Sequence, residues 1–286
     1  MLGPAEVREL AERLGVAPTK KLGQNFVIDP NTVRKIVRLA GVEAGESVGE
    51  VGPGLGSLTL GILEAGARVV AVEIDHRLAA ELPATVAAMQ PGAEARLGVI
   101  RSDALDVTRA ALQDPGGAGP PEVLVANLPY NVSVPILMHL LELLPGLRRG
   151  LVMVQAEVGH RIAAVPGGKE YGAPSAKAAW YGDWRIAGNV SRRIFWPVPG
   201  VDSVLVGYEK RETPFGTDEE RRLTFDLVNA AFAQRRKMLR QSLQTVLGDT
   251  APTVAVLVAA GIDPTARAEQ LGIEAYLAIA RAAARG

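Results

Sequence analysis

The stretch Ser47-Val48-Gly49-Glu50-Val51-Gly52-Pro53-Gly54-Leu55-Gly56 decides the fold. It runs from a short β-rich segment into a loop with glycine at every second position, and residues 58–63 then have helical character. Glycines at a strand-to-helix turn let a ligand approach the backbone at the helix N-terminus. Residues 68–74 form the next predicted strand. Glu73 near its end lies about twenty residues after the loop, where an acid can bond two ribose hydroxyls. The pattern predicts a doubly wound, mostly parallel α/β sheet that binds a nucleoside.

The charge of Glu50 helps to separate two ligands that share such a loop, a dinucleotide and S-adenosyl-L-methionine. A carboxylate two residues before Gly52 would repel a pyrophosphate, whereas it would attract the ammonium and sulfonium of S-adenosyl-L-methionine. We therefore expect S-adenosyl-L-methionine on Gly52, Gly54 and Glu73. Asp103, just past the predicted strand at 97–100, is placed to accept a hydrogen bond from an adenine amino group, although a loop-capping role explains it equally well.

The tetrapeptide Asn127-Leu128-Pro129-Tyr130 directly follows another predicted strand, residues 123–126. Ligands of open α/β sheets bind outside the carboxyl ends of strands, so the tetrapeptide is expected beside the cofactor. Its residue types suit methylation of an exocyclic amine on a base, whose lone pair is delocalised into the ring. The Asn127 oxygen and a backbone carbonyl near Pro129 can accept the two N–H bonds and favour the pyramidal, nucleophilic amine. Tyr130 would stack on the extruded base.

The rest of the chain predicts two domains. Further strands are expected at residues 150–155 and 201–208, followed by a linker around residues 213–217. Beyond the linker, apolar residues recur on one helical face, and residues 254–260 and 273–283 predict more helices. We expect a sheet domain over residues 1–212 and a helical domain over residues 216–286.

Composition excludes several chemistries. None of the 286 residues is Cys, which rules out thiolate catalysis, Cys-ligated zinc, iron–sulfur clusters and disulfides. The three His have no metal-ligand spacing, so no metal is expected. The longest stretch without a charge, residues 123–141, contains prolines and predicts no membrane span, and the N-terminus does not resemble a signal peptide. We expect a cytoplasmic protein.

Five motifs together resemble those of the ribosomal RNA adenine N6,N6-dimethyltransferases, most closely the bacterial branch that acts on 16S RNA of the small subunit. The resemblance covers nearly the whole chain. The motifs are Lys21-Leu22-Gly23-Gln24-Asn25-Phe26-Val27-Ile28-Asp29, the Glu50 to Gly56 loop, Asn127 to Asn131, Phe195-Trp196-Pro197-Val198-Pro199 with Val201, Asp202 and Ser203, and Ala231-Phe232-Ala233-Gln234-Arg235-Arg236-Lys237. Gly49 departs from the family, which usually has a bulky apolar residue in that strand position.

The resemblance implies a seven-stranded Rossmann-like methyltransferase sheet and a C-terminal helical domain that recognises RNA. It implies dimethylation of two adjacent adenosines in the 3′-terminal hairpin loop of 16S RNA, a role in small-subunit biogenesis, and no metal. The implied cofactor contacts are Asn25, Val27, Gly52, Gly54, Glu73, Asp103, Ala104 and Asn127. The implied catalytic residues are Asn127, Leu128, Pro129, Tyr130 and Phe195, with the rings of Tyr130 and Phe195 enclosing the target adenine. A monomer is the default expectation.

Net charge is zero, with 31 basic and 31 acidic side chains, so RNA contact must come from local clusters. The candidates are Lys20, Lys21, Arg192, Arg193, Arg235, Arg236, Lys237 and Arg240. Two alternatives share the motifs. One is the related 23S RNA adenine methylase that confers macrolide resistance. The other is a non-catalytic RNA-binding assembly or transcription factor on the same fold.

Overall fold

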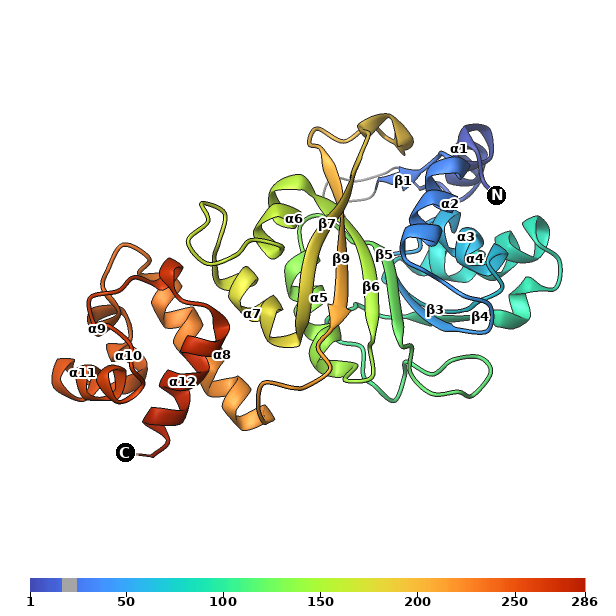
Figure 1. Cartoon of the computed structure of the whole chain (residues 1–286). Coiled ribbons are helices and arrows are strands. Elements are labelled where there is room, and N and C mark those ends of the chain that lie inside the picture. Colours follow the sequence, from blue (N-terminus) through green and yellow to red (C-terminus); the bar gives the residue numbers. More distant parts are fainter. Residues whose placement is uncertain (17–24, 286) are drawn as a thin grey trace. The chain divides into compact units, whose positions relative to one another are not determined.

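The structure is a computed structural model that describes residues 1–16 and 25–285 (Figure 1). The chain forms two compact units. The first comprises Met1–Gly159 and Arg185–Glu209, and the second His160–Trp184 and Lys210–Gly286. The sequence predicted one boundary between residues 212 and 216. The structure in addition groups residues 160–184 with the C-terminal helices.

The first unit is built on a seven-stranded sheet within residues 25–285, with strand order β4-β3-β2-β5-β6-β9-β7. The pairs among β4, β3, β2, β5 and β6 are parallel, and β9 runs antiparallel to β6. The predicted doubly wound, mostly parallel sheet is confirmed. The strands are β2 (Ser47–Val51), β3 (Arg68–Glu73), β4 (Leu97–Arg101), β5 (Val123–Asn127), β6 (Arg149–Gln155), β7 (Gly182–Val190) and β9 (Ser203–Lys210).

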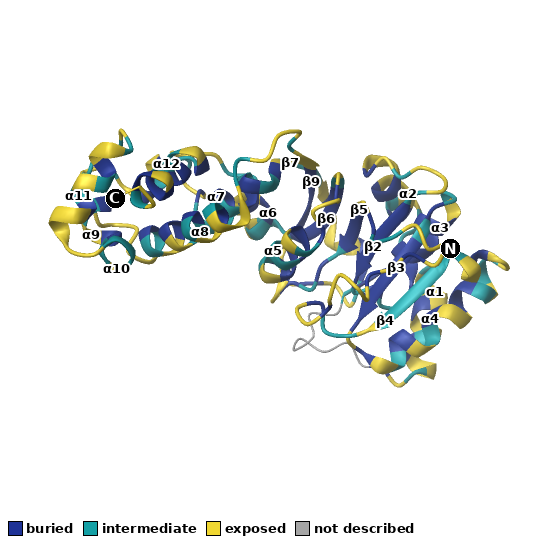
Figure 2. Ribbon diagram, turned by 90° about the horizontal axis from the view of Figure 1, so that it is seen from below, coloured by how far each residue is buried: buried dark blue, intermediate teal, exposed yellow. Residues whose placement is uncertain are grey.

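Burial explains the continuous apolar runs within β3, β5 and β6, at residues 69–72, 123–126 and 150–154. All five residues of β2 are buried, and Figure 2 shows buried residues concentrated along the central strands. Parallel strands lie between helices on both faces, which removes the need for polar alternation. The helices of the first unit are α1 (Pro4–Arg13), α2 (Pro30–Leu39), α3 (Ser57–Glu64), α4 (His76–Met89), α5 (Ser133–Leu143) and α6 (Ala156–Ile162, which reaches into the second unit), with 3₁₀ turns η2 (Ala93–Arg96) and η3 (Arg192–Ile194).

A second, two-stranded sheet in the first unit lies beside the glycine loop. In it, β1 (Phe26–Val27) pairs antiparallel with β8 (Phe195–Trp196), so that Val27 lies opposite Phe195. The backbone of β1 is also held from α3, because Ser57 Oγ donates to the carbonyl of Val27 over 2.6 Å. This pairing joins the start of the chain to a segment about 170 residues later.

The second unit is helical. Its helices are α7 (Ala173–Tyr181), α8 (Asp218–Ala233), α9 (Leu239–Ser242), α10 (Gln244–Leu247), α11 (Thr250–Ala259) and α12 (Ile273–Ala283), with a 3₁₀ turn η4 (Ala268–Gln270). The hydroxyl of Thr217 caps α8 by accepting from Glu220 N–H, and the Glu220 carboxylate accepts from Thr217 N–H. Trp180 packs in the core against Phe215 and Phe225. Within the described residues, no helix has the length and apolar character to cross a membrane.

Candidate active site

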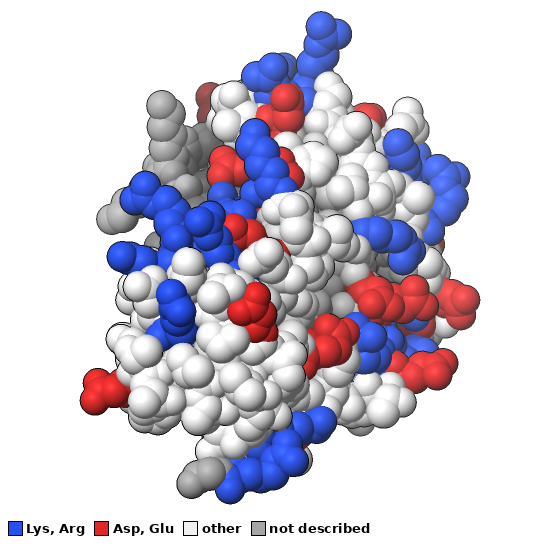
Figure 3. Space-filling view, turned by 60° about the vertical axis from the view of Figure 1, so that its left-hand side comes forward, with Lys and Arg blue, Asp and Glu red and all other residues white. Residues whose placement is uncertain are grey.

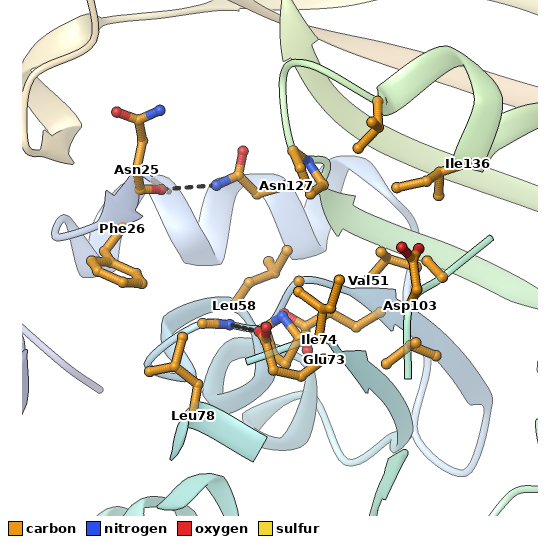
Figure 4. A pocket seen from close by; sticks show the side chains of 18 of the residues that line it. Asn25, Phe26, Val51, Leu58, Glu73, Ile74, Leu78, Asp103, Asn127 and Ile136 are labelled. Atoms are coloured by element: carbon orange, nitrogen blue, oxygen red, sulfur yellow. Dashed lines mark hydrogen bonds between the residues drawn. The ribbon is translucent and has the colours of Figure 1, made fainter. Parts of the chain in front are cut away.

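A pocket of about 1180 Å³, its open mouth included, lies at the carboxyl ends of β2, β3 and β5 (Figure 4). The segment before β1, the glycine loop, the end of β3 and the turns after β4 and β5 all contribute to its walls. The eight residues predicted to contact a cofactor all line it: Asn25, Val27, Gly52, Gly54, Glu73, Asp103, Ala104 and Asn127. The pocket lies entirely within the first unit. The sequence therefore located the cavity, and the cofactor roles of these residues stay predictions.

Glu73 is held as a hydrogen-bond acceptor in the wall of the pocket. Its Oε2 accepts from Gly54 N–H at 3.1 Å and its Oε1 from Asp75 N–H at 2.9 Å. Gly54 reaches this position with φ +59°, and a Cβ there would lie 2.9 Å from two ring atoms of Phe26. Burial raises the pKa of Glu73, while the backbone donors oppose that rise. The carboxylate is thus fixed in place, as binding a pair of hydroxyls requires.

Glu50 differs from the sequence interpretation, which treated it as a charged group. The side chain is buried, and its Oε2 accepts from the Thr59 hydroxyl at 2.7 Å. Burial, with a smaller contribution from the charge of Glu73, raises the pKa of Glu50 to about 8. At neutral pH the carboxyl is therefore mostly protonated. It attracts a cation only after losing that proton, which a nearby positive charge favours.

Apolar side chains complete the pocket, and sequence reasoning missed them. Ile74 follows Glu73 directly, Leu105 follows Ala104, and Val132 lies just after the tetrapeptide; all three are exposed and line the cavity. Their position just after strand ends was visible in the sequence, but their exposure was not. Asp103 Oδ1 accepts from Leu105 N–H at 2.9 Å, so the loop-capping role of Asp103 is real, and the residue also lines the pocket.

Asn127 ends β5 and projects its amide toward the segment before β1. The Nδ2 group donates to the carbonyl of Asn25 at 3.1 Å, and Figure 4 shows this contact on the opposite side of the cavity from Glu73. Asn127 Oδ1 is buried and has no hydrogen-bond partner among the described residues. Orphaned buried acceptors are costly and rare in native proteins. The donor that would satisfy this oxygen is therefore expected from a ligand.

The other residues of the tetrapeptide are held by β6 and β9. Leu128 N–H donates to the carbonyl of Met153 at 3.1 Å, and Pro129 lines the pocket. The hydroxyl of Tyr130 lies 2.5 Å from Ser203 Oγ at the start of β9, and burial raises the pKa of Tyr130. Tyr130 and Phe195 are both buried and do not line the pocket. An adenine enclosed between their rings stays a prediction.

The predicted basic residues have different surroundings. Arg192 Nε lies 2.9 Å from Asp202 Oδ1, whereas Arg193 is exposed. In the second unit, Arg235 Nε lies 3.7 Å from Glu269, and Arg240 is half-buried. Arg236 and Lys237 are exposed, and Lys20 and Lys21 lie outside the described residues. Figure 3 shows Lys and Arg side chains in separate groups between uncharged areas. RNA contact by these residues stays a prediction.

No cluster of metal-ligating side chains occurs in the described parts of the chain, residues 1–16 and 25–285.

Comparison with solved structures agrees with the fold. A dimethyladenosine transferase from Plasmodium falciparum matches with a TM-score of 0.73 at 22% identity, over 89% of this chain and 95% of that one. The 23S rRNA methyltransferase ErmE matches with a TM-score of 0.63 at 24% identity, over 90% of this chain and 99% of that one. At these identities the likeness concerns the fold alone.

Sequence comparison is more specific. A protein named ribosomal RNA small subunit methyltransferase A from Leifsonia xyli is 67% identical over 98% of both chains. One of the same name from Streptomyces coelicolor is 55% identical over 98% of this chain and 96% of its own length. The model of the family described as ribosomal RNA adenine dimethylase matches residues 17–285. The resemblance inferred from the motifs is thus confirmed: this chain belongs to the ribosomal RNA adenine dimethylase family.

Proposed function

We propose that this protein is an enzyme that dimethylates N6 of adenosines in small-subunit ribosomal RNA with S-adenosyl-L-methionine as methyl donor. The observation that carries the proposal is the buried, unpartnered Asn127 Oδ1 in the pocket wall. Family membership and the names of the similar proteins support the same reaction.

The residues present fit S-adenosyl-L-methionine. Glu73 offers two fixed acceptor oxygens for ribose hydroxyls, and Ile74 and Leu105 offer apolar surface for an adenine. Gly52 and Gly54 line the pocket with φ values of +66° and +59°, which favour glycine, and the missing Cβ of Gly54 leaves room for the ring of Phe26. When bound there, S-adenosyl-L-methionine supplies an electrophilic methyl group on a sulfonium.

Asn127 has two tasks in this proposal. Its Nδ2 group donates to Asn25, which fixes the direction of the amide and leaves Oδ1 to accept an N6–H of the target. In the first methyl transfer a carbonyl beside Pro129 accepts the other N6–H; in the second, the monomethylated amine has one N–H left, which Asn127 Oδ1 accepts. Together these acceptors hold the amine pyramidal, so that its lone pair is available at nitrogen. The hydrogen bonds strengthen as nitrogen becomes positive, which stabilises the transition state more than the ground state.

The finer assignments are part of the same proposal. Tyr130 and Phe195 enclose the target base once it is extruded, which needs a rearrangement because both rings are buried. The substrate is the pair of adjacent adenosines in the 3′-terminal hairpin loop of an immature small subunit, approached in the cytoplasm by a monomer. The basic groups at residues 192–193 and 235–240 neutralise phosphates.

Methylation of isolated subunits tests the proposal. Small subunits from a strain lacking the modification are incubated with the protein and labelled S-adenosyl-L-methionine, and the nucleosides are identified by mass spectrometry. We expect N6,N6-dimethyladenosine in small-subunit RNA only. Asn127→Ala should lower turnover on the order of a hundredfold or more. Asn31→Ala, an exposed Asn on α2, is the matched control and should retain full turnover.

Two results would contradict the proposal. Product in large-subunit RNA would assign the chain to the 23S-directed activity instead. No product despite tight calorimetric binding of S-adenosyl-L-methionine would favour a binding role without catalysis.

A further inference from the structure

The segment 197–202, here named the strap, connects β8 to β9 at the edge of the site. Before it, the ring of Trp196 stacks on that of Phe26, a pocket-lining residue, with centroids 6.4 Å apart and planes inclined by 24°. After it, Ser203 Oγ bonds the hydroxyl of Tyr130 at 2.5 Å. The strap is therefore fixed at one end to the cofactor pocket and at the other to the tetrapeptide that contains Asn127.

The strap exposes two large apolar side chains, Val198 at 64% and Val201 at 46%. Exposed apolar side chains elsewhere in the described part of the first unit are few, and most of them line the pocket. They are Leu39, Ile74, Leu105 and Val132, of which only Leu39 lies away from it. Apolar exposure in this unit is thus concentrated around the site, as expected where a ligand covers it.

Two prolines and several contacts restrict the strap before any partner binds. Two prolines restrict its backbone, at positions 197 and 199. The Arg192 side chain contacts the strap at two residues. Arg192 Nε lies 2.9 Å from Asp202 Oδ1, and Arg192 Nη1 donates to the carbonyl of Gly200 at 3.4 Å. The carbonyl of Asp202 also accepts from Ala156 N–H at 2.8 Å. Such preorganisation lowers the entropy lost when the strap binds.

We propose that Val198 and Val201 form an apolar wedge that contacts the bases next to the target adenosine and replaces the stacking lost when that adenosine leaves the helix or loop. This inference rests on the proposed function: the Asn127 side chain lies in the pocket wall, so the target base must leave its stack before its N6 can reach that side chain. Unstacking costs a few kcal/mol per step, and apolar side chains inserted at a base step are a known way to offset that cost.

The chemistry of the strap favours bases over phosphates or a protein partner. Residues 197–202 include no Lys or Arg, and their one charged side chain is the acidic Asp202, so phosphate binding is not the task of the strap. The neighbouring Arg193 is exposed and can hold the RNA backbone beside the wedge. Two valines on a narrow loop offer too little area for a stable protein interface, whereas one base face is of similar size.

The test compares Val198→Ala/Val201→Ala with Leu39→Ala on small subunits. Leu39 ends α2 near the amino ends of the parallel strands, away from the pocket at their carboxyl ends, and Arg149 at the start of β6 donates there to the carbonyls of Ala40 and Gly41. We expect kcat/KM for subunits to fall on the order of tenfold in the double variant. Calorimetric affinity for S-adenosyl-L-methionine should stay unchanged in all three proteins, and Leu39→Ala should match the wild type.

Cross-linking identifies what the wedge touches. With Val198→p-benzoylphenylalanine, photolysis on the subunit should give cross-links to nucleotides next to the dimethylated adenosines. Cross-links to a ribosomal protein or to distant RNA, or a double variant within twofold of wild-type kcat/KM, would overturn the wedge while the proposed function stands. A wild-type protein that methylates no subunit would overturn both.

Discussion

At the scale of single residues, two carboxyl groups that line one pocket have different hydrogen-bond donors. Glu73 is bound by two backbone N–H groups, whereas Glu50 is buried with one hydroxyl donor, from Thr59. The pKa of Glu50 is consequently raised to about 8, mainly by burial. The same residue type thus provides a fixed acceptor at one position and a group that titrates near neutral pH at the other.

Glu50 predicts a pH dependence of stability. Its pKa in the folded protein lies above 4.5, the ordinary value for a Glu side chain, so between pH 4.5 and about 8 the native state keeps a proton that the unfolded chain has lost. The free energy of unfolding therefore contains a component from Glu50 that falls as pH rises through this window, by at most about 1.4 kcal/mol per pH unit. Glu50→Gln removes that component.

Urea unfolding from pH 5 to pH 9 measures this contribution of Glu50 to the free energy of unfolding. The stability of wild type relative to Glu50→Gln should decline with rising pH and level off above about 8. Glu43→Gln, which replaces an exposed Glu by the same amide, is the control for the substitution itself. Parallel curves for wild type and Glu50→Gln would contradict a raised pKa.

At the scale of elements, the surroundings of β2 explain why Gly49 stands where the family usually has a bulky apolar residue. A Cβ on Gly49 would lie 3.1 Å from Pro121 Cγ and 3.4 Å from Pro121 Cβ. Pro121 stands just before β5 and occupies the space that a bulky side chain in β2 would take. At Gly49 the side chain of Pro121, in the loop before β5, therefore fills the space that a larger residue of β2 would occupy, and the core stays filled.

This packing predicts a compensating pair. Gly49→Val alone should lower the free energy of unfolding by about 1–3 kcal/mol, because Pro121 leaves no room for the side chain. In a protein that already carries Pro121→Ala, Gly49→Val should lower the free energy of unfolding by at least about 1 kcal/mol less than it does in the wild type, as expected of residues in contact. Urea unfolding of the four proteins in the cycle gives the coupling. Additive effects would mean that Pro121 does not fill the position.

Most elements of the sheet were predictable because each is a local pattern. The strands predicted at 47–51, 68–74 and 123–126 agree with β2, β3 and β5 to within one residue. Two-residue β1 and β8 were not predicted, since their sequences carry no periodicity and they form only by pairing with each other. For the same reason, the bond between Tyr130 and Ser203 has no signature in the sequence.

The site was predictable to the extent that its chemistry is local. Glycines and acids at strand ends located the pocket, and Asn127 was singled out by its neighbours. The protonation of Glu50 was not predictable, because it depends on burial. The apolar walls were missed because Ile74 and Leu105 read as ordinary core residues until the structure exposes them.

At the scale of the whole molecule, the second unit is assembled from two separate stretches of chain. Residues 160–184 contribute α7, and the helices after residue 210 contribute the rest. The sequence indicated the linker and the C-terminal helices, but the joining of α7 to them depends on aromatic contacts between distant residues. Trp180 is central, with ring centroids 5.9 Å from Phe215 and 6.0 Å from Phe225.

Trp180→Ala should therefore destabilise the second unit by about 3–5 kcal/mol, the usual cost of removing a buried aromatic side chain. Affinity for S-adenosyl-L-methionine should remain unchanged, because every residue that lines the pocket belongs to the first unit. Thermal unfolding followed by circular dichroism, together with calorimetric titration of the cofactor, separates the two effects. Val258→Ala, an exposed residue of α11, is the control and should shift stability by less than about 0.5 kcal/mol. If Trp180→Ala lost cofactor affinity at a temperature where the protein is folded, the two units would be energetically coupled, and the first would depend on the second for its binding-competent state.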